Sequence, residues 1–186
     1  MEHFYQNIHG WFNFENIYRE MATKLKDGDH YVEVGAWKGT SAAFLATEIA
    51  NSGKKIQFDV VDTWLGSPEH LAGGSWADQD AIDGRLFEVF TENMKPVEGF
   101  YKPLRMTSLE ASLLYEDNSL DFVLLDAAHD RINVSIDIKA WLPKVKSGGI
   151  LAGDDYHPVW DGVRQAVNDL LPGFRVENQT WIYVKP

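Results

Sequence analysis

An α/β fold is predicted, a three-layer sandwich in which helices cover both faces of a seven-stranded, mostly parallel sheet. The first observation behind it is that strand-like and helix-like segments alternate along most of the 186 residues, a pattern typical of parallel sheets. The second lies in residues 174–186, where two short apolar segments flank Asn178 and Gln179. This last pattern predicts an antiparallel hairpin at the end of the sheet.

The first part of the chain predicts two strands with helices beside them. Apolar residues at helical spacing predict a helix over 14–27, within an N-terminal helical segment that spans 1–28. The segment HYVEVG predicts a strand over 30–35, and the helix over 39–52 begins at Gly-Thr-Ser, which is a start signal. The segment IQFDVVD predicts the second strand, over 56–62.

Residues 63–85 differ from the rest because they hold several glycines and tryptophans and show no regular period. Loops this long are uncommon in compact domains and are usually functional, so we expect this segment to cover the site as a lid. A helix over 85–95, a strand over 100–106 and a short helix over 108–115 are expected to follow it.

The second half of the chain continues the alternation. The segment LDFVLLD has the composition of a strand buried on both faces, over 120–126. A helix over 131–143, a strand over 148–153 and a helix over 159–171 are expected between this strand and the C-terminal hairpin. Because no repeat, linker or low-complexity segment interrupts the pattern, residues 1–186 are expected to form a single domain.

Composition excludes several classes of partner and site. The formal net charge is −11 and no basic patch stands out, so nucleic acid is not an expected partner. The absence of cysteine excludes disulfides, thiolate zinc sites and a cysteine nucleophile. No apolar stretch approaches the roughly 20 residues that span a bilayer, and the N-terminus lacks the pattern of a signal peptide. We therefore expect a cytoplasmic protein with no membrane partner.

Two glycines, Gly35 and Gly39, lie between the first strand and the next helix, in VEVGAWKGTSAAFLA. Glycine lets the backbone pass close to a ligand, and the helix N-terminus offers free N–H groups. The pattern is not the dinucleotide fingerprint, which needs a glycine where Trp37 stands. We interpret the loop as a candidate cofactor site, with a plain strand-to-helix turn as the alternative.

A carboxylate, Asp62, ends the second strand. An acidic side chain in this place can accept hydrogen bonds from both ribose hydroxyls of a nucleoside. Thr63 and Trp64 follow it and are candidates to flank an adenine. The alternative is that Asp62 only caps the following loop.

Three more aspartates and a histidine follow the fourth and fifth strands. Asp126 ends the fourth strand, His129 stands three residues later, and Asp154 and Asp155 end the fifth strand. If these strands are neighbours, their carboxyl ends bring the three carboxylates together at the edge where ligands of such sheets bind. Crowded carboxylates repel one another unless a cation compensates, and Mg²⁺ prefers oxygen ligands. A magnesium site is therefore a candidate.

A structural interpretation of the same residues stays open. Asp154 and Asp155 could instead cap the next helix or pair with Arg131 or Arg164. His129 is a candidate catalytic base or orienting group, although a lone histidine is more often structural.

Together these segments resemble the class I S-adenosylmethionine-dependent methyltransferases of the methyltransferase domain 24 kind. They are also similar to the metal-dependent sugar O-methyltransferases of macrolide and aminocoumarin biosynthesis. The resemblance extends from Tyr31 to the end of the chain, with its pieces in the family's order. The pieces are VEVGAWKGTSA, VDTWLGSPEH, SLDFVLLDAAHD, DIKAWLPKVKSGGILAGDDY and WDGVRQAV.

The resemblance implies a Rossmann-like fold with S-adenosylmethionine as cofactor, its methionyl half on the glycine loop and its ammonium group supported by Glu33. It implies adenine contacts at Thr107 and Ser108, although Ser108 could equally cap the next helix. It also implies that Asp126 lies beside the cofactor and helps to deprotonate the acceptor, and that Mg²⁺ binds to the three aspartates.

The expected function is therefore methylation of a hydroxyl group on a small-molecule acceptor, sugar or natural-product-like, with assistance from Mg²⁺. Metal-free methylation of another small acceptor and cofactor binding without turnover remain alternatives. The chain departs from the family at Ala127 and Ala128, where a glycine often follows the fourth-strand aspartate. The sequence is compatible with both a monomer and a homodimer.

Overall fold

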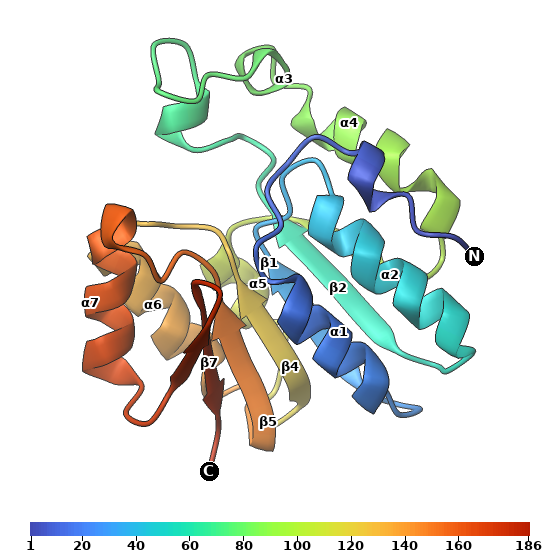
Figure 1. Ribbon diagram of the computed structural model, residues 1–186, viewed down its shortest axis with the longest axis vertical. Helices are drawn as coiled ribbons and strands as arrows, with labels where there is room; N and C mark the ends of the chain where they lie inside the picture. Colours follow the sequence, from blue (N-terminus) through green and yellow to red (C-terminus); the bar gives the residue numbers. More distant parts are fainter.

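A computed structural model describes residues 1–186 and shows a three-layer sandwich around one mixed sheet (Figure 1). The strand order is β3-β2-β1-β4-β5-β7-β6. Strands β1 to β5 pair in parallel, whereas β7 is antiparallel to both β5 and β6. The strands are β1 (His30–Val34), β2 (Gln57–Asp62), β3 (Lys102–Arg105), β4 (Leu120–Leu125), β5 (Val145–Gly153), β6 (Arg175–Glu177) and β7 (Thr180–Val184).

The helices form the two outer layers. The α-helices are α1 (Glu15–Lys24), α2 (Thr40–Ser52), α3 (Gln79–Ile82), α4 (Leu86–Met94), α5 (Ser108–Ser112), α6 (Arg131–Trp141) and α7 (Asp161–Leu170). Alternate residues of the strands face opposite layers, as the pleat requires. Tyr31 belongs to the core shared with α1, α2 and α4, and Val32 to the core shared with α5, α6 and α7.

The predicted fold class is confirmed, including the seven strands, the adjacent fourth and fifth strands and the C-terminal hairpin. Asn178 and Gln179 form its turn with φ of 47° and 70°, the left-handed conformation that tight hairpin turns require. Several boundaries shift by one to three residues, and among the strands the start of β5 shifts most. Strand β5 begins at Val145 because its pairing with β4 extends back to Leu120 across a shift in register.

The loop predicted over 63–85 contains more regular structure than its sequence pattern indicates. It includes a 3₁₀ turn, Pro68–His70, and the single turn of α3, which Asp78 caps by accepting from the N–H groups of Asp80 and Ala81. Three backbone hydrogen bonds hold the loop together: the N–H groups of Gly74, Trp76 and Asp78 donate to the carbonyl oxygens of Leu71, Glu69 and His70, respectively. The segment is therefore a compact unit that rises above the carboxyl edge of the sheet in Figure 1.

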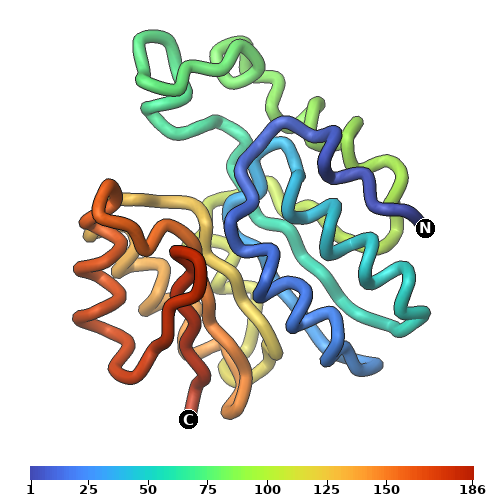
Figure 2. The backbone as a smooth tube through the Cα atoms, in the orientation of Figure 1, coloured from blue at the N-terminus to red at the C-terminus, as the bar shows by residue number.

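The N-terminal residues form a strap rather than a continuous helical segment. Only the 3₁₀ turn Tyr5–Asn7 precedes α1. Figure 2 follows this stretch, in dark blue, from the outer side of α2 across the carboxyl end of the sheet. At the crossing, a Cβ atom on Gly10 would lie 2.5 Å from Thr40 Oγ1, so the strap passes directly over the start of α2.

None of the helices combines the length and the apolar character needed to cross a membrane. The longest, α2, has 13 residues.

Candidate functional site

A cavity of about 800 Å³ opens at the carboxyl end of the parallel strands, where ligands bind in sheets of this kind. Its walls come from the N-terminal strap, the loop after β1, the loop after β2 and the loops after β3, β4 and β5. Nine predicted site residues line it: Gly35, Asp62, Thr63, Thr107, Ser108, Asp126, His129, Asp154 and Asp155. Three others, Glu33, Gly39 and Trp64, do not.

The glycine loop approaches the neighbouring strand closely. Gly35 has φ of 89°, and a Cβ atom there would lie 1.9 Å from the backbone oxygen of Asp126. Gly39, with φ of 96°, is the residue before α2 and packs against Phe90 and Met94 rather than facing the cavity. The two glycines therefore shape the loop, and only Gly35 lies on the cavity wall.

Asp62 braces this loop from the next strand. Its Oδ2 accepts hydrogen bonds from the backbone N–H groups of Ala36, at 2.8 Å, and Trp37, at 3.0 Å. Its Oδ1 accepts from the N–H of Trp64 at 2.7 Å, which is the capping contact considered from the sequence. A half-buried carboxylate can accept about four hydrogen bonds, so some capacity remains toward the cavity.

Trp64 lies in the core instead of beside the cavity. Its ring packs against Phe87 and Phe90, and its Nε1 donates to the backbone oxygen of Trp37 at 2.9 Å. Thr63, the residue before it, does line the cavity. Of the two candidates to flank an adenine, the structure presents only Thr63.

Glu33 is fully buried behind the glycine loop. Tyr18 and Ser41 each donate a hydrogen bond of 2.6 Å to its carboxylate. Burial raises the pKa of Glu33 to about 7, although these two hydrogen bonds oppose the rise. Ser41 lines the cavity and Glu33 does not, so the predicted support for a cofactor ammonium group would pass through Ser41.

Thr107, and not Ser108, caps helix α5. Thr107 and Glu110 form a reciprocal capping box at the start of the helix. The Ser108 hydroxyl instead donates to Asp137 Oδ1 at 2.6 Å and accepts from Trp141 Nε1 at 2.9 Å. The capping alternative for Ser108 is therefore wrong, because its hydroxyl serves a half-buried network between α5 and α6.

The three predicted aspartates do meet at the ends of β4 and β5. Withdrawal from water raises the pKa of Asp126 well above its usual value, and the charges of Asp154 and Asp155 raise it further. Burial and Asp155 raise the pKa of Asp154 to about 7. Asn13 donates to Asp154 Oδ2 at 3.3 Å, while Asp154 Oδ1 is buried without a partner. The cluster can therefore accept further hydrogen bonds or coordinate a cation.

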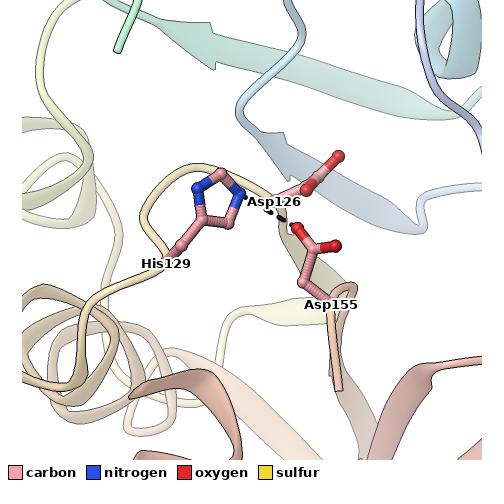
Figure 3. Close-up of side chains that lie close together, drawn as sticks. All are labelled: Asp126, His129 and Asp155. Atoms are coloured by element: carbon pink, nitrogen blue, oxygen red, sulfur yellow. Dashed lines mark ion pairs between the residues drawn. The ribbon is translucent and has the colours of Figure 1, made fainter. Parts of the chain in front are cut away.

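His129 links this cluster to the loop after β2. Its Nε2 lies 2.9 Å from Asp155 Oδ2 and its Nδ1 lies 3.1 Å from Glu69 Oε1. Figure 3 shows the ring turned toward Asp155, with Asp126 alongside. Burial by itself lowers the pKa of His129, but Asp155 and Glu69 outweigh burial and the net pKa is raised. A carboxylate lies at each ring nitrogen, and both carboxylates favour the protonated form of the ring.

Neither arginine considered from the sequence enters the cluster. Arg131 pairs with Asp169 at 2.6 Å and Arg164 lies 3.7 Å from Asp161. The residue that caps the next 3₁₀ turn is His157. Both structural alternatives for Asp154 and Asp155, pairing with an arginine and capping a helix, are therefore absent from the structure. Three side chains each offer one possible ligand atom, and these atoms lie within 4.8 Å of one another: Asp126, His129 and Asp155.

Several lining residues were not predicted. Glu69, His70 and Trp76 come from the segment expected to act as a lid, so the long aperiodic loop was the available signal. Trp11 and Asn13 come from the N-terminal strap. No local pattern marks them, because their place in the site depends on where the strap crosses the sheet.

A family model described as a methyltransferase domain matches residues 32–156. No curated protein sequence matches the chain. Among solved structures, the O-methyltransferase NovP superposes with a TM-score of 0.64 at 16% identity, over 92% of this chain and 78% of NovP. Cofactor-bound Rv0187 from MTB gives 0.64 at 14% identity, over 95% and 81%. A SAM-dependent O-methyltransferase from Thermotoga maritima gives 0.59 at 13% identity, over 95% and 67%.

The structural neighbours share the Rossmann-like sheet, and the family model spans both the glycine loop and the aspartate cluster. The match covers well over half of the 186 residues. The chain belongs to this methyltransferase family and is a class I S-adenosylmethionine-dependent methyltransferase.

Proposed function

We propose that this enzyme methylates a hydroxyl group of a small-molecule acceptor, sugar or natural-product-like, in the cavity at the carboxyl end of the sheet. The observation that carries the proposal is the carboxylate cluster of Asp126, Asp154 and Asp155 in the same cavity as the glycine loop. Carboxylates in this place can orient an acceptor hydroxyl and receive its proton. NovP, an O-methyltransferase, has the same fold.

The cavity fits S-adenosylmethionine at its glycine-loop end. Gly35 presents backbone without a side chain, Asp62 retains acceptor capacity for ribose hydroxyls, and Thr63, Thr107 and Ser108 line the adjoining wall. The volume of about 800 Å³ is within the usual range for cofactor and ligand sites. The cofactor supplies an electrophilic methyl group on sulfur.

The aspartate cluster fits a hard divalent cation such as Mg²⁺. Asp126, Asp154 and Asp155 would hold it, since all three offer oxygen ligands. The buried, unpartnered Asp154 Oδ1 and the absence of any lysine or arginine from the cavity lining support this assignment. When bound, such an ion supplies positive charge that lowers the pKa of an acceptor hydroxyl and helps to orient it.

The protein's own residues then position the two reactants and handle the proton. Asp126, beside the glycine loop, receives the hydroxyl proton as the acceptor oxygen bonds to the methyl carbon and the carbon–sulfur bond breaks. The products are a methyl ether and S-adenosylhomocysteine. His129, held by Asp155 and Glu69, orients the cluster instead of acting as the base. Holding both reactants in line supplies much of the acceleration.

Release of S-adenosylhomocysteine tests the proposal. Purified protein with S-adenosylmethionine and MgCl₂ is incubated with panels of polyols, glycosides and phenols, and methylated products are identified by mass spectrometry. Ether products support O-methylation. Methylation only at nitrogen or carbon, or binding of the cofactor with no product from any hydroxyl compound, would contradict it.

Removing the Asp62 carboxylate is expected to weaken cofactor binding. Asp62→Ala loses both the bonds to the Ala36 and Trp37 N–H groups and the proposed ribose contact, which together cost about 1.5–3 kcal/mol of binding free energy. Calorimetry with S-adenosylhomocysteine measures this loss. Asp59→Ala is the matched control, because Asp59 lies earlier in β2 and bonds His30 and Tyr115 outside the cavity. If Asp62→Ala and the wild type bind S-adenosylhomocysteine with equal affinity, Asp62 does not contribute to cofactor binding.

We further propose that residues 63–85 act as the lid over the acceptor. Lys38 of the glycine loop, whose side chain is 7% exposed, bonds Asp78 at 2.8 Å and Asp80 at 2.7 Å. Glu69 contacts His129, and Trp76 packs on Trp160 across the cavity. These contacts connect the lid to both sides of the site.

The lid is expected to loosen when Lys38 is replaced by methionine. The substitution leaves Asp78 without its lysine partner and Asp80 paired only with Arg85, which should lower the free energy of lid opening by about 2–3 kcal/mol. Hydrogen exchange of the lid amides should then accelerate, while exchange in β1 and β4 stays unchanged. Lys95→Met, which removes an exposed lysine paired only with Glu92, is the control. If Lys38→Met leaves lid exchange at the wild-type rate, the ion pairs do not hold the lid.

A further inference from the structure

The cavity is lined by carboxylates without any balancing lysine or arginine. Its acidic residues are Asp62, Glu69, Asp126, Asp137, Asp154 and Asp155. Two of them lie toward the cofactor end, where Asp62 braces the glycine loop and Asp137 accepts from Ser108. The other four gather at the acceptor end around His129.

Aromatic rings cover the acceptor end from three elements. Trp160 stacks on His129 with centroids 4.1 Å apart and lies 5.4 Å from Trp76 of the lid. Trp11 of the strap, which also lines the cavity, stacks on His70 of the lid with centroids 5.8 Å apart. Tryptophan faces attract organic cations by their quadrupoles, so rings and carboxylates favour the same kind of ligand.

The site already holds one nitrogen-containing ring in this manner. His129 lies between Glu69 and Asp155 and against the face of Trp160. Two carboxylate oxygens can still accept hydrogen bonds, because Glu69 Oε2 makes no hydrogen bond and the buried Asp154 Oδ1 has no partner. Asp154 is 5% exposed and lines the cavity.

Bound cations do not remove the imbalance. S-adenosylmethionine carries a net single positive charge, and a divalent ion would add two. Even if one more positive charge is counted for the His129 ring, these charges total four, fewer than the six carboxylates that line the cavity. An acceptor with a phosphate or carboxylate group would therefore meet like charge in a partly desolvated site, which costs several kcal/mol.

We infer that the acceptor is a hydroxyl compound that carries an ammonium group, received between the Glu69 carboxylate and the faces of Trp76 and Trp160. The inference rests on the proposed function and names the charge class of its acceptor. Phosphorylated and carboxylated acceptors are excluded by the same arrangement.

Two matched ligand series test the charge class. The first is methyl 2-amino-2-deoxyglucoside, methyl glucoside and methyl glucuronide, and the second is tyramine, 4-ethylphenol and 3-(4-hydroxyphenyl)propionate. Calorimetry at pH 7 uses the full chain saturated with S-adenosylhomocysteine and MgCl₂. In at least one series the ammonium member should bind about tenfold tighter than the neutral one, with no measurable binding of the anion.

Two variants test whether Glu69 causes the preference for the ammonium ligand. Glu69→Gln should remove most of the tenfold difference by weakening the ammonium ligand and sparing the neutral one. Glu116→Gln removes an equal charge from an exposed residue before β4, outside the cavity, and should leave the difference intact.

Three results would overturn the inference: a neutral member that binds as tightly as its ammonium partner in both series, an anionic member that binds best, or no binding by any ammonium member. Affinity for S-adenosylhomocysteine and ether formation from neutral alcohols are measured on the same protein. If these persist while the charge preference is absent, the inference fails and the proposed function stands.

Discussion

Replacing Gly35 with alanine is expected to destabilise the fold by about 4 kcal/mol and to abolish cofactor binding. The residue has φ of 89°, and the added Cβ atom would lie 1.9 Å from the Asp126 backbone oxygen. Left-handed strain and a clash with rigid backbone each cost about 1–3 kcal/mol. The backbone at the end of β1 must then move away from β4, which separates the glycine loop from the aspartate cluster. Urea denaturation measures the loss.

Gly28→Ala provides the control for backbone conformation. Gly28 has φ of 90°, nearly that of Gly35, but an added Cβ atom there meets nothing within 4 Å. Its replacement should therefore cost only the strain of the left-handed conformation, about 1–2 kcal/mol. Similar losses for the two variants would show that close approach of the strands is not what requires glycine at position 35.

Removal of divalent cations is expected to lower methyl transfer at least about a hundredfold, while affinity for S-adenosylhomocysteine changes less than about twofold. The reason is spatial: the proposed ion lies on Asp126, Asp154 and Asp155, whereas the glycine loop and Asp62 belong to β1 and β2. Dialysis against EDTA, followed by assay with and without added MgCl₂, measures the effect. Full activity in the chelator would favour the metal-free alternative.

Asp154→Asn should imitate the chelator. The amide keeps the size of the side chain but loses the negative charge, and its N–H₂ group would face the position now taken by the unpartnered Oδ1. Asp161→Asn, at an exposed residue outside the cavity lining, should retain activity and its response to Mg²⁺. A variant at Asp154 that keeps full, chelator-sensitive activity would remove this residue from the ion's ligands.

The parts of the site that could be predicted from sequence are those that follow strand ends. Because β4 and β5 are parallel neighbours, Asp126 and Asp154 reach one edge whatever fills the rest of the molecule. The loop at Gly35 follows from the same rule. Each of these predictions needed only the order of strands and the residue at which each strand stops.

Side-chain direction at those strand ends could not be predicted in the same way. Trp64 has φ of 51° and turns into the core next to Phe90, although it directly follows two residues that line the cavity. Glu33 points to the face of β1 that α1 and α2 cover, where Tyr18 and Ser41 donate hydrogen bonds to its carboxylate. Both outcomes depend on packing against helices that are distant in sequence, which no motif encodes.

The contact between Asn13 and Asp154 joins residues 141 positions apart, and this separation has a consequence for the order of folding. During synthesis the strap emerges well before its partner at the end of β5. Contacts of such long range slow folding, because the chain entropy of loop closure is lost before they form. In a ribosome-bound chain that stops before β5, the strap should consequently be held already by its contacts with α1 and α2, and its resistance to protease should increase further once β5 is released.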